Sequence, residues 1–265
     1  MKRVSAILAA LLFTMLAGCG GGDDNPAGTG GNGNEEHISI VSLTPADESC
    51  GLGNQVEIEI TFDRPVEDFY TLLIPGFDIL QSGHFIPNED RTSFRRDHAI
   101  QGDKIYQLMI FSAFDADTSV FLDEPSMITF TGQDSMPVCG VEGRIRTPSA
   151  YGPEGTVLLL LNGMYWSPQF TLDDEAFTNA MQAISFVENG NGDFNLCHLP
   201  TGYYYLFAFK ITEGEYSAEN DDNLFGYYLD PESQGQLGRI VLTDSEPQMT
   251  DVEIQLFKGQ SFFDE

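Results

Sequence analysis

Short stretches in which apolar and polar residues alternate recur along this chain from residue 55 onward. The clearest, Gln55 to Phe62, places four apolar side chains on one face of an extended strand: Val56, Ile58, Ile60 and Phe62. Asp103 to Phe111 and Met127 to Thr131 predict two further strands by the same pattern. Short alternating segments separated by turn residues are typical of an all-β protein.

A second group of strands is centred on Gly192 to Phe209, GDFNLCHLPTGYYYLFAF. Phe194 and Leu196 alternate with polar neighbours, and the next strand is aromatic throughout. Between them, Pro200-Thr201-Gly202 predicts a β-hairpin turn with a positive φ at Gly202. Other strands are predicted at 141–145, 156–161, 183–187, 239–242 and 252–256. About seven short strands with turns between them are typical of a β-sandwich.

Both faces of the aromatic strand are apolar, so both need cover. One face carries Tyr204, Leu206 and Ala208, and the other carries Tyr203, Tyr205, Phe207 and Phe209. Residues 164–182 could cover the second face, because Phe177, Ala180, Met181 and Ile184 fall at helical spacing. Alternatively, the aromatic residues form an exposed platform for a sugar or peptide. The candidate ligand-binding residues are Tyr165, Trp166, Tyr203, Tyr205, Tyr227 and Tyr228.

The first 36 residues predict export and anchoring. Lys2 and Arg3 precede an apolar run too short to span a bilayer, so residues 1–18 are a predicted signal peptide. The run ends in Leu16-Ala17-Gly18-Cys19, which resembles the lipobox of bacterial lipoproteins. That resemblance implies cleavage before Cys19 and lipidation of its sulfur and its new amine. Gly20 follows, where Asp would favour inner-membrane retention, so an outer-membrane lipoprotein is expected. Residues 19–36 are a glycine-rich tether.

Residues 37–134 resemble the bacterial Ig-like domains of S-layer-type proteins. The resemblance rests on Pro45-Ala46-Asp47, the alternating strand 55–62, and Asp63-Arg64-Pro65-Val66 after it. SFRRDHAI, residues 93–100, departs from that family because a hydrophobic strand is expected there. The resemblance implies a structural domain that serves as a spacer or an adhesin building block.

Residues 138–258 resemble carboxypeptidase-regulatory-like domains, which have a prealbumin (transthyretin-like) fold. The order of motifs carries the resemblance: VEGRI, GTVLLLL, the stretch 192–209, and LFGYY. It implies a structural or carbohydrate-binding-like accessory module without catalytic residues. Together the resemblances imply two tandem antiparallel β-sandwiches, Ig-like and then prealbumin-like. The short linker, 133–138, predicts an elongated rod.

The chain is strongly acidic, with 12 basic and 41 acidic residues. Without Lys2 and Arg3 its formal charge changes from −29 to −31, which excludes nucleic acid and anionic lipid surfaces as general partners. The densest acidic run contains Glu213, Glu215, Glu219, Asp221 and Asp222, which could supply oxygen ligands to a structural calcium ion. The run lacks the spacing of an EF-hand, and no other cofactor is indicated.

Three cysteines remain once Cys19 carries lipid: Cys50, Cys139 and Cys197. In an oxidising compartment an odd number leaves one free thiol. A Cys139–Cys197 bond within the second sandwich is the preferred pairing, and a Cys50–Cys139 bond across the linker is the alternative.

No spacing of a catalytic or metal site is found. The four histidines are scattered, and Gly-x-Ser-x-Gly, HExxH and Cys-x-x-Cys motifs are absent from the sequence. Acid pairs such as Asp115 and Asp117 arise by chance in so acidic a chain. We therefore expect a non-enzymatic cell-envelope protein with a structural, adhesive or ligand-display role. The alternative is a carbohydrate-binding surface module, and the expected partner is an envelope protein or a polysaccharide.

Overall fold

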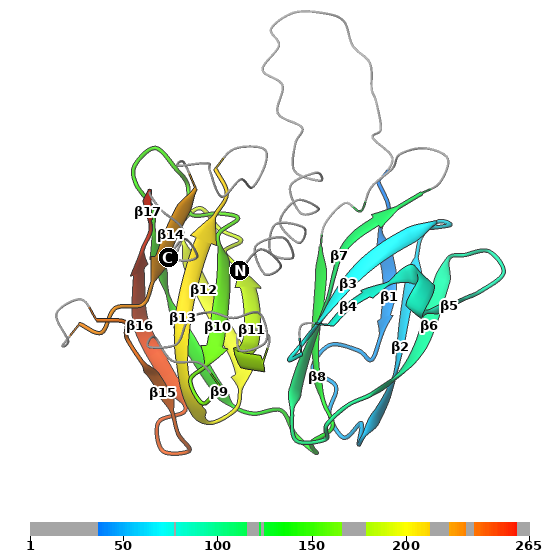
Figure 1. The fold of residues 1–265 in the computed structure, drawn as a ribbon, viewed down its shortest axis with the longest axis horizontal. Helices are drawn as coiled ribbons and strands as arrows, with labels where there is room; N and C mark the ends of the chain where they lie inside the picture. The colour runs from blue at the N-terminus through cyan, green and yellow to red at the C-terminus, as the bar shows by residue number, and fades with distance from the viewer. Residues whose placement is uncertain are drawn as a thin grey trace, which may run out of the picture.

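The computed structural model describes residues 37–76, 78–115, 122, 125–165, 179–212, 223–231 and 236–258. Across these residues the protein consists of two β-sandwiches that lie side by side and are joined at one end by the chain between β8 and β9 (Figure 1). The all-β prediction is confirmed. No helix in these ranges is both long and apolar enough to span a membrane.

The first sandwich contains two four-stranded sheets. One has the order β1 (Ile40–Thr44), β2 (Gln55–Phe62), β6 (Ser93–Ala99), β5 (Ile86–Pro87). The other has the order β4 (Asp78–Gln81), β3 (Asp68–Ile74), β7 (Ile105–Phe114), β8 (Ser126–Thr131), and a 3-10 turn (Ser82–His84) follows β4. The predicted inward face of β2 is confirmed, because its four apolar side chains are buried. Residues 93–99 of SFRRDHAI form β6, and Phe94 and Ile100 are the residues of this segment that enter the core.

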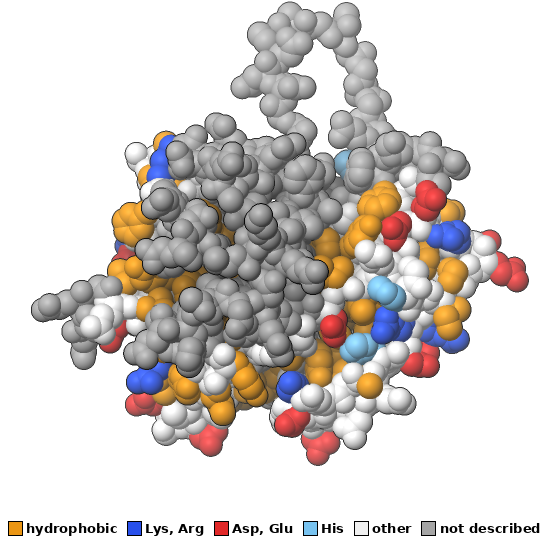
Figure 2. Space-filling view, in the orientation of Figure 1, with side chains coloured by type: hydrophobic (Ala, Val, Ile, Leu, Met, Phe, Trp, Pro, Cys, Tyr) orange, Lys and Arg blue, Asp and Glu red, His pale blue; other side chains and the backbone are white. Residues whose placement is uncertain are grey.

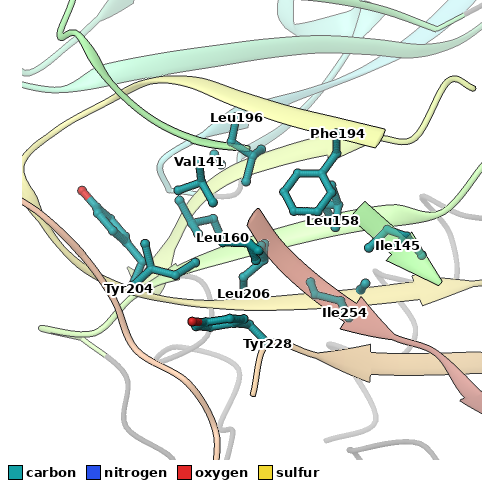
Figure 3. Close-up of a cluster of buried hydrophobic side chains, with 14 of the residues drawn as sticks. Val141, Ile145, Leu158, Leu160, Phe194, Leu196, Tyr204, Leu206, Tyr228 and Ile254 are labelled. Carbon is teal, nitrogen blue, oxygen red and sulfur yellow. The ribbon is translucent and has the colours of Figure 1, made fainter. Parts of the chain in front are cut away.

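The second sandwich packs a three-stranded sheet on a larger one. The smaller sheet has the order β12 (Asp193–Leu199), β9 (Cys139–Arg146), β16 (Gln248–Gln255), and β16 runs parallel to β9. The larger has the order β11 (Met181–Phe186), β10 (Val157–Asn162), β13 (Gly202–Lys210), β14 (Leu224–Tyr227), β17 (Phe257–Lys258), and β15 (Ile240–Leu242) pairs with β13. Val141, Leu196 and Ile254 from the smaller sheet meet Leu158, Leu160 and Leu206 from the larger (Figure 3).

The predicted strands around the Leu-Pro turn are present, but they do not form a hairpin. β12 pairs with β9, whereas β13 pairs with β10, β14 and β15, so the turn carries the chain from one sheet to the other. The alternating pattern specifies a strand and its faces, but it does not specify the neighbouring strand. Sequence proximity therefore gave the wrong pairing.

The predicted positive φ at Gly202 is also wrong. The left-handed residue near this corner is His198, with φ of 57°, where the register between β12 and β9 shifts. The Tyr204 hydroxyl then fixes the corner by donating a hydrogen bond of 2.6 Å to the Pro200 carbonyl. Burial raises the pKa of Tyr204, which keeps this donor protonated.

A third apolar cluster joins the two sandwiches. Leu72 and Ile74 of β3 and Met109 and Phe111 of β7 pack in one buried cluster with side chains of the larger second sheet: Val157, Leu159, Leu161, Met181, Ile184 and Phe209. Inside this contact the Ile184 amide donates to the Gln107 side-chain oxygen at 2.9 Å. The four sheets are therefore stacked in succession, and the predicted elongated rod is wrong.

This contact also answers how the outer face of the aromatic strand is covered. Phe209 is buried in the cluster, and Tyr205 and Phe207 are partly buried against it. The cover therefore comes in large part from the first sandwich. Met181 and Ile184 contribute from strand β11 and not from the predicted helix, whereas Phe177 lies outside the described residues.

Candidate functional site

The aromatic residues of the predicted platform lie in different places and differ in solvent exposure. Tyr165 is 56% exposed, and Trp166 lies outside the described residues. Tyr203 is partly buried, with the Arg239 guanidinium 5.5 Å from the centre of its ring. Tyr205 is partly buried at the contact between the sandwiches.

The last two candidate tyrosines point to opposite faces of the larger second sheet. The Tyr227 ring lies 6.5 Å from that of Phe207, on the outer face, and Tyr228 is buried in the inner core (Figure 3). The described tyrosines thus do not share one exposed surface.

The calcium candidates Glu213, Glu215, Glu219, Asp221 and Asp222 all lie outside the described residues. Within the described ranges no cluster of His, Cys, Asp or Glu is arranged to hold a metal ion. The calcium proposal therefore stays a prediction.

All three described cysteines are free thiols in the structure, which differs from the predicted Cys139–Cys197 bond. Cys139 faces the core of the second sandwich, whereas Cys197 points outward from the neighbouring strand. Side chains on opposite faces of one sheet cannot meet in a disulfide without moving the backbone. The alternative partner, Cys50, is exposed in the first sandwich. Burial raises the pKa of Cys139, so this thiol is also a poor nucleophile at neutral pH.

The corner at His198 lies at the joint between the two sandwiches. His198 Nε2 is 3.0 Å from the Glu48 carboxylate of the first sandwich, and Nδ1 is 3.3 Å from the Pro137 carbonyl of the linker. Glu48 itself has a φ of 59°. Two non-glycine residues in the left-handed region thus meet across the joint and fix the linker between them.

A polar groove over the smaller sheet of the second sandwich is the best-formed candidate site. It has a volume of about 780 Å³ and is lined by residues of β9, β12 and β16, by Ser185 and Phe186 of β11, and by Glu188 and Asn189, which follow β11 in the chain. This volume lies within the range of about 300–1,000 Å³ that is typical of small-molecule sites. The sheet's other face is the core, so the groove has a rigid floor.

The floor of the groove is a row of paired charges. Arg144 of β9, the central strand, lies in register with Asp193 of β12 on one side and Glu253 of β16 on the other. Its guanidinium donates to the Asp193 carboxylate at 2.6 and 2.7 Å. Two residues along β9, Arg146 forms an ion pair with Glu253. Each arginine therefore lies beside a carboxylate on an adjacent strand.

A second hollow of about 490 Å³ continues the groove past the edge of β16. The two share Arg146, Asp251 and Glu253, and the second adds Tyr227 and Pro231. The two hollows therefore adjoin along β16, and together they are called the channel.

On the face seen in Figure 2, red acidic side chains are dispersed among white and orange ones, with a few blue side chains between them. The acidity of the chain is thus spread out there, which is typical of a soluble surface.

Sequence reasoning missed the groove, although one signal was present. In VEGRIR, residues 141–146, the charged residues Glu142, Arg144 and Arg146 alternate with residues that face the core. This alternation predicts a charged outer face for β9. The alternation does not show which strands lie beside β9, and those strands supply Asp193 and Glu253.

No family model matches this chain, and no curated protein matches it. Among solved structures, the major pilin subunit BcpA of Bacillus cereus is 7% identical, with 83% of this chain and 70% of that one covered and a TM-score of 0.26. The pilus 2b backbone protein of group B streptococcus is 10% identical, with 84% and 98% covered and a TM-score of 0.24. A Pseudomonas aeruginosa protein whose name proposes carbohydrate binding is 14% identical, with 45% and 89% covered and a TM-score of 0.28. At such scores these likenesses define no family.

Proposed function

We propose that this chain is a lipid-anchored, non-catalytic protein of the cell envelope, with a structural, adhesive or ligand-display role. In this proposal the signal peptide and Cys19 deliver it to the outer membrane. The tether holds the two sandwiches away from the lipid, and their outer faces are the surfaces presented to partners.

The observation that carries the proposal is the buried apolar contact between the sandwiches. Met109 and Leu72 are fully buried in it, and Leu159 is 3% exposed. Buried apolar area stabilises such a contact by about 25 cal/mol per Å². Two sandwiches held together by a buried apolar contact suit a protein that transmits force or presents a fixed surface. Many enzymes instead have a mobile cleft that closes over the substrate, and a fixed contact between the sandwiches does not provide one.

The anchor is tested with Cys19→Ser. Wild-type protein is expected in the outer-membrane fraction after a high-salt wash, because three acyl chains bind a bilayer essentially permanently. The Cys19→Ser variant is expected to lose this association and to move to soluble fractions, measured by immunoblotting of fractionated cells. Cys50→Ser is the matched control and should leave the protein in the membrane. Retention of Cys19→Ser in the washed membranes would contradict the anchor.

Carbohydrate binding is the second candidate function. It is favoured by the polar groove over β12, β9 and β16, and not by the aromatic set predicted from sequence, most of which is partly or fully buried.

A further inference from the structure

The positions of the positive and negative side chains in the groove restrict which ligands the groove can accept. Its two guanidinium groups, Arg144 and Arg146, lie on the central strand, β9. Carboxylates line both sides: Asp193 on β12, and Asp251 and Glu253 on β16. Glu142 on β9 and Glu188 after β11 complete the set. Two guanidinium groups and five carboxylates give the lining a formal charge of −3.

This order disfavours both kinds of charged ligand. An anion would meet an excess of carboxylates in a chain that is itself strongly acidic. A cation could approach the rim, but at the floor it would have to replace a guanidinium from its contact with Asp193 or Glu253. The guanidinium groups already supply the counter-charge of these carboxylates, and exchanging one exposed ion pair for another gains little free energy.

A neutral ligand rich in hydroxyl groups has no such conflict. Each hydroxyl both donates and accepts hydrogen bonds. The Arg144 guanidinium supplies strong donors and the Asp193 carboxylate supplies strong acceptors. The two groups lie side by side, with nitrogen–oxygen distances of 2.6–2.7 Å. Neighbouring hydroxyls of a sugar ring can accept from the first and donate to the second. Asn189, Asn195 and Thr250 add neutral groups that can do both.

The shape of the channel indicates a ligand longer than one ring. The second hollow extends the lining from Arg146 to two aromatic residues, Tyr227 and Tyr228. An aromatic surface can pack against the apolar face of a pyranose ring. The polar floor and the aromatic end would then contact successive sugar units of one chain.

We propose that this channel binds a neutral oligosaccharide, with Arg144 and Asp193 holding hydroxyl groups at its floor and Tyr227 contacting a ring at its end. The proposal rests on the second candidate function and gives it a site, a ligand charge and a ligand length. It differs from the aromatic platform predicted from sequence, because neither Tyr165 nor Trp166 takes part.

The test is calorimetric titration of the full lipidated protein in detergent. The probes are glucose hexamers with α-1,4, β-1,4 and β-1,3 linkages, an acidic galacturonate hexamer and a cationic glucosamine hexamer. At least one neutral hexamer is expected to bind, and to bind more tightly than either charged one. In Arg144→Met its affinity is expected to fall at least tenfold, and in Tyr227→Ala severalfold.

The first sandwich offers a matched control. Arg95 pairs with Glu57 on an outer sheet face at 3.6 Å, and these side chains are 59% and 47% exposed, against 52% and 48% for Arg144 and Asp193. Arg95→Met should leave binding unchanged, and circular dichroism should show that both variants are folded.

Several results would overturn the proposal. They are tighter binding of a charged hexamer, an equal loss of affinity in Arg95→Met, or no binding of any neutral hexamer at millimolar concentration. Binding that shifts Trp166 fluorescence but survives Arg144→Met would return the site to the aromatic platform. None of these outcomes bears on membrane anchoring, which the Cys19→Ser fractionation decides separately.

Discussion

Met109→Asp is expected to separate the two sandwiches without unfolding either. Met109 is fully buried, and it belongs to the contact cluster and not to the core of the first sandwich. A carboxylate placed there would enter a cluster of apolar side chains, and burying an uncompensated charge costs about 3–5 kcal/mol. When the two sandwiches separate, the carboxylate becomes exposed to water, and the hydrophobic core of each sandwich remains intact.

Small-angle scattering measures this outcome as an increase in maximum dimension. Far-ultraviolet circular dichroism should remain that of a β protein, and proteolysis within linker 133–138 should become faster. Val41→Asp is the control, since Val41 is 64% exposed on β1. An unchanged scattering profile for Met109→Asp would show that this contact does not hold the sandwiches together.

Gly143→Ala is expected to destabilise the second sandwich by about 2–3 kcal/mol, the upper part of the range for overpacking. A β carbon at Gly143 would lie 2.0 Å from the Val252 carbonyl oxygen and 2.7 Å from the Phe194 ring. The oxygen belongs to the backbone of β16, so relief requires β16 to move away from β9 along their parallel pairing.

Chemical denaturation of the full chain measures the effect, monitored by circular dichroism. Gly190→Ala carries the same substitution on the turn before β12, where a β carbon would meet no atom within 4 Å. It should leave the midpoint unchanged. Equal midpoints for the two variants would mean that β16 does not lie where the structure places it.

The strands were largely predictable from sequence, and their arrangement was not. Alternation located β2, β9, β12 and β16 within a few residues, and continuous apolar or aromatic runs located β10 and β13. Both patterns are local properties of the chain. Pairing depends on residues distant in the chain. The parallel pairing of β16 with β9 and the passage from β12 to the opposite sheet have no local signature.

The aromatic strand shows the same limit at the level of packing. Its two apolar faces correctly predicted two covering layers, because alternate side chains enter different surroundings. Nothing in Tyr203 to Phe209 distinguishes a cover made of residues 164–182 from one made of another sandwich. The apolar outer faces of β3 and β7 were the missing signal, since Leu72 and Met109 do not belong to the first core. The predicted cysteine pairing differs from the structure for a related reason, because it depended on which face of the sheet Cys197 occupies.

The shared contact has a consequence for biosynthesis. A ribosome completes every strand of the first sandwich, through β8 at Thr131, before it reaches the residues that cover Leu72, Ile74, Met109 and Phe111. The newly made first half therefore has an apolar sheet face with no occupant until Val157 to Phe209 has followed. An uncovered face of this kind is prone to aggregation. Chaperones that hold the emerging chain should therefore bind it most strongly when its length lies between these two points.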